Sequence, residues 1–195
     1  QVQSVAYSLI PRDERDLLHL QIGSIILKNM PIHERGNIFF VAMNQLNRGK
    51  LVMEDDMKEW VAELNLKAGR EAISLSAFRN SASFFEAGIS LLCSNCWDKN
   101  YELTLQLHNS YAEVEFCNGH FGEVDRVTKI IIEKAKSISD KTRAYFILIK
   151  TLGTQRNMNT AIKVSLAALD ELGEPIQQSG IRSLLNRFHI FAKMN

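Results

Sequence analysis

Apolar residues recur at intervals of three and four along nearly all of this 195-residue chain. Such a period places them on one face of an α-helix, and no segment shows a convincing strand pattern. The period is cleanest in the second half, as in Val124, Val127, Ile131 and Ala135. The sequence therefore predicts an all-α fold.

The stripes divide the chain into helices of ordinary length with short connections, so neighbouring helices should pack antiparallel. We expect a helix over about 100–117 that Gly119 ends, a helix capped by Ser139–Asp140, one that begins at Asn159 or Thr160, and one over 179–192. The first-half stripes are Leu17, Leu20, Ile22, Ile26, Leu27; Phe39, Phe40, Met43, Leu46; Met57, Trp60, Leu64, Ala68, Ala72; and Phe78, Ala82, Phe85, Ile89, Leu92.

A weak repeat links two turns that lie 37 residues apart. In each turn a bulky residue stands three positions before a short one: Phe121 before Val124, and Met158 before Ala161. The interval is close to the ~34 residues of a tetratricopeptide unit. The bulky residue is expected to plug the gap between helix pairs. We therefore predict antiparallel pairs stacked as a tetratricopeptide-like right-handed superhelix.

Charge and composition argue against several classes of partner. The chain has 23 basic and 22 acidic side chains, which gives no electrostatic reason to bind nucleic acid or an anionic membrane. The apolar runs are too short to cross a bilayer. Three cysteines do not suggest a disulfide framework, and no leader is visible. These features predict a cytoplasmic protein that binds neither nucleic acid nor membrane.

Four residues spell a zinc pattern, namely Cys93, Cys96, Cys117 and His120. The two halves of the pattern flank the helix expected over 100–117, which separates them by roughly 25 Å. Ligands of one zinc ion must all lie within about 2.3 Å of the metal. We therefore expect no metal site, and without a βαβ context we expect no redox role for the CxxC pair.

The remaining candidates also favour structural roles. The five histidines (His19, His33, His108, His120 and His189) are scattered, and no nucleophile motif accompanies them. The carboxylates at 54–56 are typical of a helix start, and Glu113 and Glu115 do not share a helix face. The sequence contains no phosphate-binding loop and no kinase motif. We therefore predict no catalytic residue and no cofactor in this segment.

Two residues of one apolar helix point to close packing. Gly69 stands one turn after Asn65, where glycine costs about 1 kcal/mol relative to alanine. A neighbouring helix that crosses at Gly69 would account for it. Trp97 is expected to fill a turn between helix pairs. A place on a partner-binding surface is the alternative for all three.

Several segments follow one another in a distinctive order: residues 3–11 (QSVAYSLIP), 18–26 (LHLQIGSII), 45–49 (QLNRG), 62–72 (AELNLKAGREA), 77–78 (AF), 88–92 (GISLL), Trp97, and 101–105 (YELTL). Together they resemble the region after the ATPase core in AAA-like ATPases of the STAND signalling class. The resemblance spans roughly residues 1–174, and the order of the segments is more specific than any one of them.

This resemblance implies a tail of a winged-helix domain over 1–12 and a tetratricopeptide-like domain over 13–195 that continues further. In such proteins the ATPase is fused to a protein kinase-like domain, so ATP and Mg²⁺ belong to other parts of the parent chain. The implied function is a non-catalytic scaffold or regulatory module that binds a partner protein or other domains of its own chain. The alternatives are a standalone all-helical enzyme and a nucleic-acid-binding module.

Overall fold

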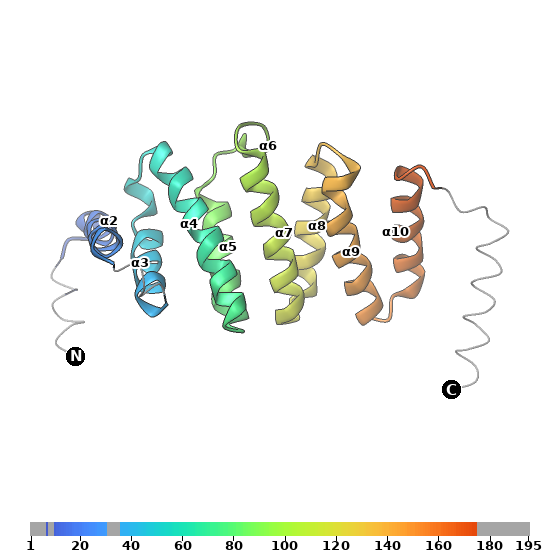
Figure 1. Ribbon diagram of the computed structural model, residues 1–195, viewed down its shortest axis with the longest axis horizontal. Helices are drawn as coiled ribbons and strands as arrows, with labels where there is room; N and C mark the ends of the chain where they lie inside the picture. Colours follow the sequence, from blue (N-terminus) through green and yellow to red (C-terminus); the bar gives the residue numbers. More distant parts are fainter. Residues whose placement is uncertain (1–6, 8–9, 31–35, 175–195) are drawn as a thin grey trace. The chain divides into compact units, whose positions relative to one another are not determined.

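The all-α prediction is confirmed over the part of the chain that the computed structural model describes, residues 7, 10–30 and 36–174 (Figure 1). Every regular element in these ranges is a helix, and consecutive helices pack in antiparallel pairs. The helix expected over 179–192 lies outside the described residues. The elements are α2 (Arg12–Asn29), α3 (Asn37–Arg48), the 3-10 turn η1 (Lys50–Val52), α4 (Asp55–Ser74), α5 (Phe78–Leu91), α6 (Cys96–Lys99), α7 (Tyr101–Asn118), α8 (Phe121–Lys134), α9 (Ile138–Thr154) and α10 (Met158–Glu171).

The chain forms two compact units, Gln1–His120 and Phe121–Asn195, which we call the N-terminal and C-terminal units. In the N-terminal unit α2 packs on α3, α4 packs on α5, and α5 also packs on α7. Its apolar core includes side chains with no exposed surface, among them Met43, Leu46, Val61, Phe85 and Leu107. The right-handed superhelix remains a prediction.

In the C-terminal unit α9 packs against both α8 and α10. Val124, Val127 and Ile131 are fully buried, and Ala135 is nearly so, as the stripe predicted. A small cluster of Leu148, Leu152 and Ala161 joins α9 to α10, with Ile132 and Val164 packed partly against it.

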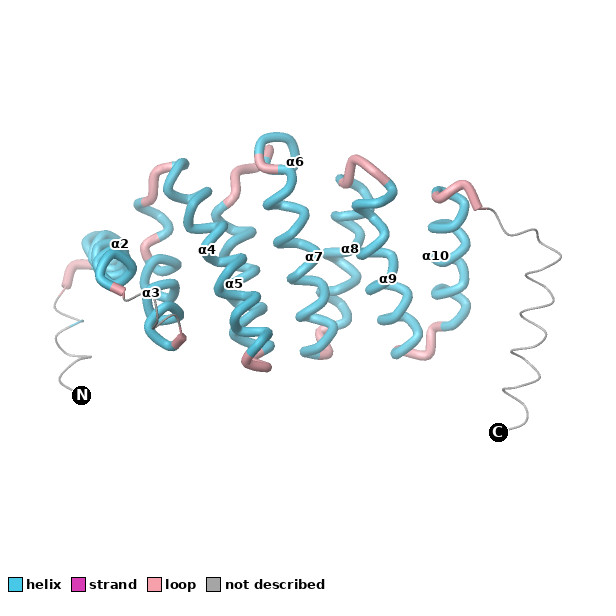
Figure 2. The backbone as a smooth tube through the Cα atoms, in the orientation of Figure 1, coloured by secondary structure: helices cyan, strands magenta, loops and turns pink. Residues whose placement is uncertain are grey.

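One turn geometry recurs at three helix connections, α4 to α5, α7 to α8 and α9 to α10, and the short loops are visible in Figure 2. Each such turn holds one residue with positive φ two positions before the new helix. The three residues are Ser76 (φ 58°), Gly119 (φ 79°) and Arg156 (φ 59°). They precede the helix starts Phe78, Phe121 and Met158.

The same backbone hydrogen bond closes all three turns. The N–H groups of Ala77, His120 and Asn157 donate to carbonyls five residues earlier, at 2.8, 3.0 and 2.9 Å. This is the six-to-one bond of a Schellman motif, which requires a left-handed residue. The turn geometry therefore recurs three times along the described part of the chain.

The structure corrects two predicted helix starts. The N-cap of α9 is Ser137, whose Oγ accepts from the backbone N–H of Asp140 at 3.2 Å, so Ser139 already lies inside the helix. Helix α10 begins at Met158, with Asn157 as its cap. A polar residue inside the first turn resembles a cap in sequence, because helix starts favour the same residue types at both places.

Several predicted core residues lie at the surface instead. Leu17 and Ile22 on α2 are exposed, and the buried positions of that helix are His19 and Gly23. Met158 is half exposed, so it does not plug a gap between helix pairs. In each case the apolar pattern alone picked the wrong residues.

Candidate functional site

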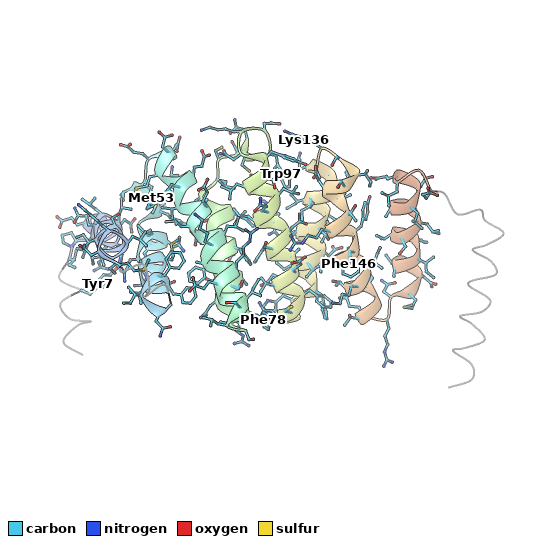
Figure 3. All side chains as sticks on the ribbon, in the orientation of Figure 1. Tyr7, Met53, Phe78, Trp97, Lys136 and Phe146 are labelled. Carbon is cyan, nitrogen blue, oxygen red and sulfur yellow. The ribbon has the colours of Figure 1, made fainter. Side chains whose placement is uncertain are left out.

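A chain of hydrogen bonds joins the segments that carried the resemblance. His19 is 6% exposed and sits between two partners. The Tyr7 hydroxyl lies 2.9 Å from its Nε2, and the Gln45 Oε1 lies 2.6 Å from its Nδ1. A neutral imidazole protonated at Nδ1 satisfies both bonds, because it accepts from tyrosine and donates to the amide oxygen. Figure 3 shows Tyr7 beside α2, where the Arg15 guanidinium lies 4.8 Å from its ring centre. His19 thus ties α2 to α3.

An asparagine pair makes the next link. The amide groups of Asn47 on α3 and Asn65 on α4 donate to each other's Oδ1 at 2.8 Å in both directions. Asn65 is fully buried, and its remaining N–H donates to the Val61 carbonyl at 3.0 Å. A buried amide must find such partners, since an unpaired one costs about 1–3 kcal/mol. This pair is therefore a lock between two helix pairs.

Gly69 lies where α4 meets α5, which confirms the predicted helix crossing. A Cβ at this position would stand 2.2 Å from Cε1 of Phe85, a ring with no exposed surface. The Ser81 hydroxyl, also buried, donates to the Gly69 carbonyl at 2.8 Å. Gly69 and Asn65 therefore have structural roles in the packing of α4.

Other glycines of the shared segments also mark close approaches. A Cβ at Gly23 would stand 2.7 Å from Leu46 Cγ, which joins α2 to α3. One at Gly49 would meet the Asp16 carbonyl at 2.7 Å, and one at Gly88 would meet Leu107 Cδ2 at 2.9 Å. The resemblance thus rests on residues that hold helices together.

The four residues of the zinc pattern do not converge. Cys93 and Cys96 precede α7, whereas Cys117 and His120 lie at its far end, beyond a helix of 18 residues. The His120 Nδ1 instead contacts the buried carboxylate of Glu115 at 2.7 Å. Among the described residues no three metal-ligating side chains cluster.

The remaining candidates lie in structural settings. His108 is buried, and its Nδ1 lies 2.8 Å from the Thr104 carbonyl. Trp97 packs on the His108 ring with centroids 5.1 Å apart and on Tyr101 at 6.0 Å, so it covers the start of α7 (Figure 3). His33 and His189 lie outside the described residues.

The acidic run opens α4 as expected, with Asp55 and Asp56 in its first turn. The hydrogen bond and the charge of Lys58, 3.0 Å away, hold the pKa of Asp55 below its usual value. A hollow of about 190 Å³ lies beside this pair, and Lys99 and Glu59 also line it. Its charges are mixed, so it favours neither an anion nor a cation.

A second hollow is apolar and was missed by sequence reading. It lies between α2, α3 and α4, and Trp60 on its wall is 45% exposed. The predicted stripe had placed Trp60 in the core. The signal available in the sequence was the spacing of Trp60, Leu64, Lys67 and Glu71, which share one helix face and pass from apolar to charged.

Among the described helices, none combines the length and the apolar character that a membrane crossing requires.

Comparison with known proteins gives one informative similarity. Over 198 aligned positions the chain is 24% identical to the hybrid signal transduction histidine kinase G of Dictyostelium discoideum. The alignment covers 88% of this chain but spans only 6% of the length of that protein. No family model and no solved structure matches the chain. The chain is thus similar to one segment of a signalling histidine kinase.

Proposed function

We propose that this chain is a non-catalytic regulatory module of a large multidomain signalling protein. In this role it binds a partner protein or another domain of its own parent chain. The observation that best supports this proposal is that distinctive residues of the N-terminal unit contact residues of a neighbouring helix and hold the two helices together. Asn47 with Asn65, and Gly69 against Phe85, are the clearest cases. Residues used in this way build a rigid surface.

Two further points support the proposal. The similarity to a small segment of a signalling histidine kinase fits a module that works within a longer chain. Stacked antiparallel helix pairs also expose long surfaces, which helical-repeat proteins use to hold other proteins.

The resemblance to STAND-class ATPases extends the proposal to nucleotide chemistry. ATP and Mg²⁺ would then act in the ATPase and kinase domains of the parent chain, and this segment would sense or transmit their state. Regulation of this kind requires contacts that differ between two states of the parent.

The phosphorylation output of the full-length parent, with and without residues 12–174, tests this function. We expect the deletion to alter how the output depends on its input signal, while phosphoryl transfer stays measurable. An unchanged input dependence would contradict the regulatory role. Calorimetry of this chain with ATP and Mg²⁺ should show no heat, and ATP turnover by the chain alone would contradict its non-catalytic nature.

A further inference from the structure

The apolar hollow of the N-terminal unit is a groove of about 420 Å³. Leu27 and Met30 at the end of α2 form one wall, buried Phe39 of α3 lies at its base, and α4 forms the other wall. Trp60 projects beside it with 45% of its surface exposed. Large, partly exposed aromatic side chains next to a cavity are typical anchors of protein interfaces.

The residues of the α4 wall change from apolar to charged along the helix. Its lining residues are Trp60, Leu64, Lys67 and Glu71, spaced four, three and four residues apart on one helix face. The face is therefore apolar over its first turns and charged over its last. Neither the Lys67 ammonium nor the Glu71 carboxylate forms an ion pair or hydrogen bond within the described part of the chain. Both charges are thus available to a partner.

We propose that this groove binds an amphipathic helix of a protein partner. Two apolar side chains of that helix pack on Trp60 and Leu64. An acidic side chain then faces Lys67, and a basic one faces Glu71 a turn further on. This inference rests on the proposed function, because it names the kind of partner that the module takes.

A helix suits this groove better than an extended peptide. A strand needs a sheet edge to pair with, and the described residues contain no strand. A helix in a groove presents anchors at i, i+4 and i+7, which is the spacing of the α4 wall itself. The charges add specificity, since the acidic residue must lie between the apolar pair and the basic residue.

The test uses two designed helical peptides and the whole chain. The matched peptide carries Leu-x-x-x-Leu-x-x-Glu-x-x-x-Lys on one face, and its isomer has Glu and Lys exchanged; each is made in both chain directions. The chain contains two tryptophans, so a Trp97→Phe background leaves Trp60 as the fluorescent reporter. We expect a matched peptide to bind at least about five-fold more tightly than its isomer, because two attractive charge contacts at the surface become repulsive in the isomer.

The decisive variant exchanges the wall charges, Lys67→Glu with Glu71→Lys. It should reverse the preference between the two peptides, while thermal melting shows that the fold is kept. Trp60→Ala, followed by calorimetry, should weaken binding at least ten-fold, whereas Leu75→Ala, an exposed apolar residue outside the groove, should not.

Equal binding of the two isomers, or tighter binding of a proline-rich peptide, would overturn the inference. So would the absence of peptide binding at millimolar concentration. If peptides fail while deletion of residues 12–174 still changes the parent's input dependence, the groove inference falls and the proposed function stands. If the deletion has no effect but the isomer preference reverses as expected, the groove stands and the regulatory role falls.

Discussion

The two units share one helical architecture but hold their helices together differently. In the N-terminal unit, glycines lie at the crossings and buried amides pair across helices, as at Gly69 and Asn65. In the C-terminal unit, a Cβ added at Gly122 or Gly153 would meet nothing within 4 Å. Its polar links between helices lie at the surface, where the Glu171 carboxylate accepts from the Tyr145 hydroxyl at 2.9 Å and contacts Lys141 at 3.2 Å.

The helices of the N-terminal unit are thus held by close steric fit and paired amides, whereas those of the C-terminal unit are held by apolar stripes and surface polar contacts. Close crossings and paired amides accept few substitutions, because neighbouring atoms are already in contact. Apolar stripes with surface ion pairs accept many.

The largest expected effect is at Gly69. Gly69→Leu should lower the free energy of unfolding by about 1–3 kcal/mol or more, because the new side chain overlaps the Phe85 ring. Gly69→Ala should also destabilise, although alanine is intrinsically better in a helix. Gly153→Ala, in open space on α9, should instead stabilise by up to about 1 kcal/mol. Urea unfolding measures all three.

A Gly69→Leu protein as stable as wild type would contradict the claim that close helix crossings hold the N-terminal unit together. Phe85→Leu provides a rescue test, because a smaller side chain leaves room for a Cβ. The cost of Gly69→Ala should be smaller in the Phe85→Leu background than in wild type.

The next effect concerns the asparagine pair. Replacement of Asn47 or Asn65 by leucine leaves the other amide without its partner, so each should cost about 1–3 kcal/mol. The double variant should cost less than the two single costs combined, and a double-mutant cycle from urea melts gives that coupling. Asn80→Leu, at an exposed position of α5, is the control and should change stability by less than about 0.5 kcal/mol. Additive costs would show that the pair does not act as a lock.

A smaller, opposite effect is expected at the repeated turns. Ser76 and Arg156 hold a left-handed conformation, which costs a non-glycine residue roughly 1 kcal/mol. Ser76→Gly and Arg156→Gly should therefore each raise the free energy of unfolding by up to about 1 kcal/mol in thermal melts. Ser76→Ala keeps the strain and should give no gain. A loss of stability in both glycine variants would contradict the shared turn geometry.

The smallest effect is at the surface link of the C-terminal unit. Hydrogen bonds from Tyr145 and then Lys141 lower the pKa of Glu171. The stability that the Glu171 carboxylate gives the folded unit is therefore fully present above the usual glutamate pKa, and it is lost as pH falls through the lowered pKa. Burial, together with Glu171, raises the pKa of Tyr145 to about 12. The stability contributed by the neutral Tyr145 hydroxyl is therefore present below pH 10 and is lost as pH rises towards 12. Glu171→Gln should cost under about 1 kcal/mol at pH 7 and less at pH 3.

Urea melts at the two pH values measure this change. Glu174→Gln is the matched control, since it removes an exposed carboxylate just beyond the end of α10 that is not part of this link. An equal cost of Glu171→Gln at both pH values would mean that the Glu171 charge does not stabilise the unit.

The sequence alone determined the fold class, the end of α7 at Gly119 and the crossing at Gly69. These follow from local rules: the helical period, glycine or asparagine at an end, and the cost of a glycine inside a helix. The separation of Cys93 from Cys117 followed equally from the length of the helix between them.

Only the tertiary structure decided which face of α2 and α4 is buried and which polar groups meet. The buried face of α2 centres on His19 and Gly23, which an apolar pattern does not find. That of α4 includes Ala68 and Ala72 of the predicted stripe, but also the polar Asn65. Burial of a histidine or an asparagine is costly unless a partner satisfies its polar groups. Those partners, Gln45 and Asn47, stand 26 and 18 residues away in the chain and come close only when the helices pack.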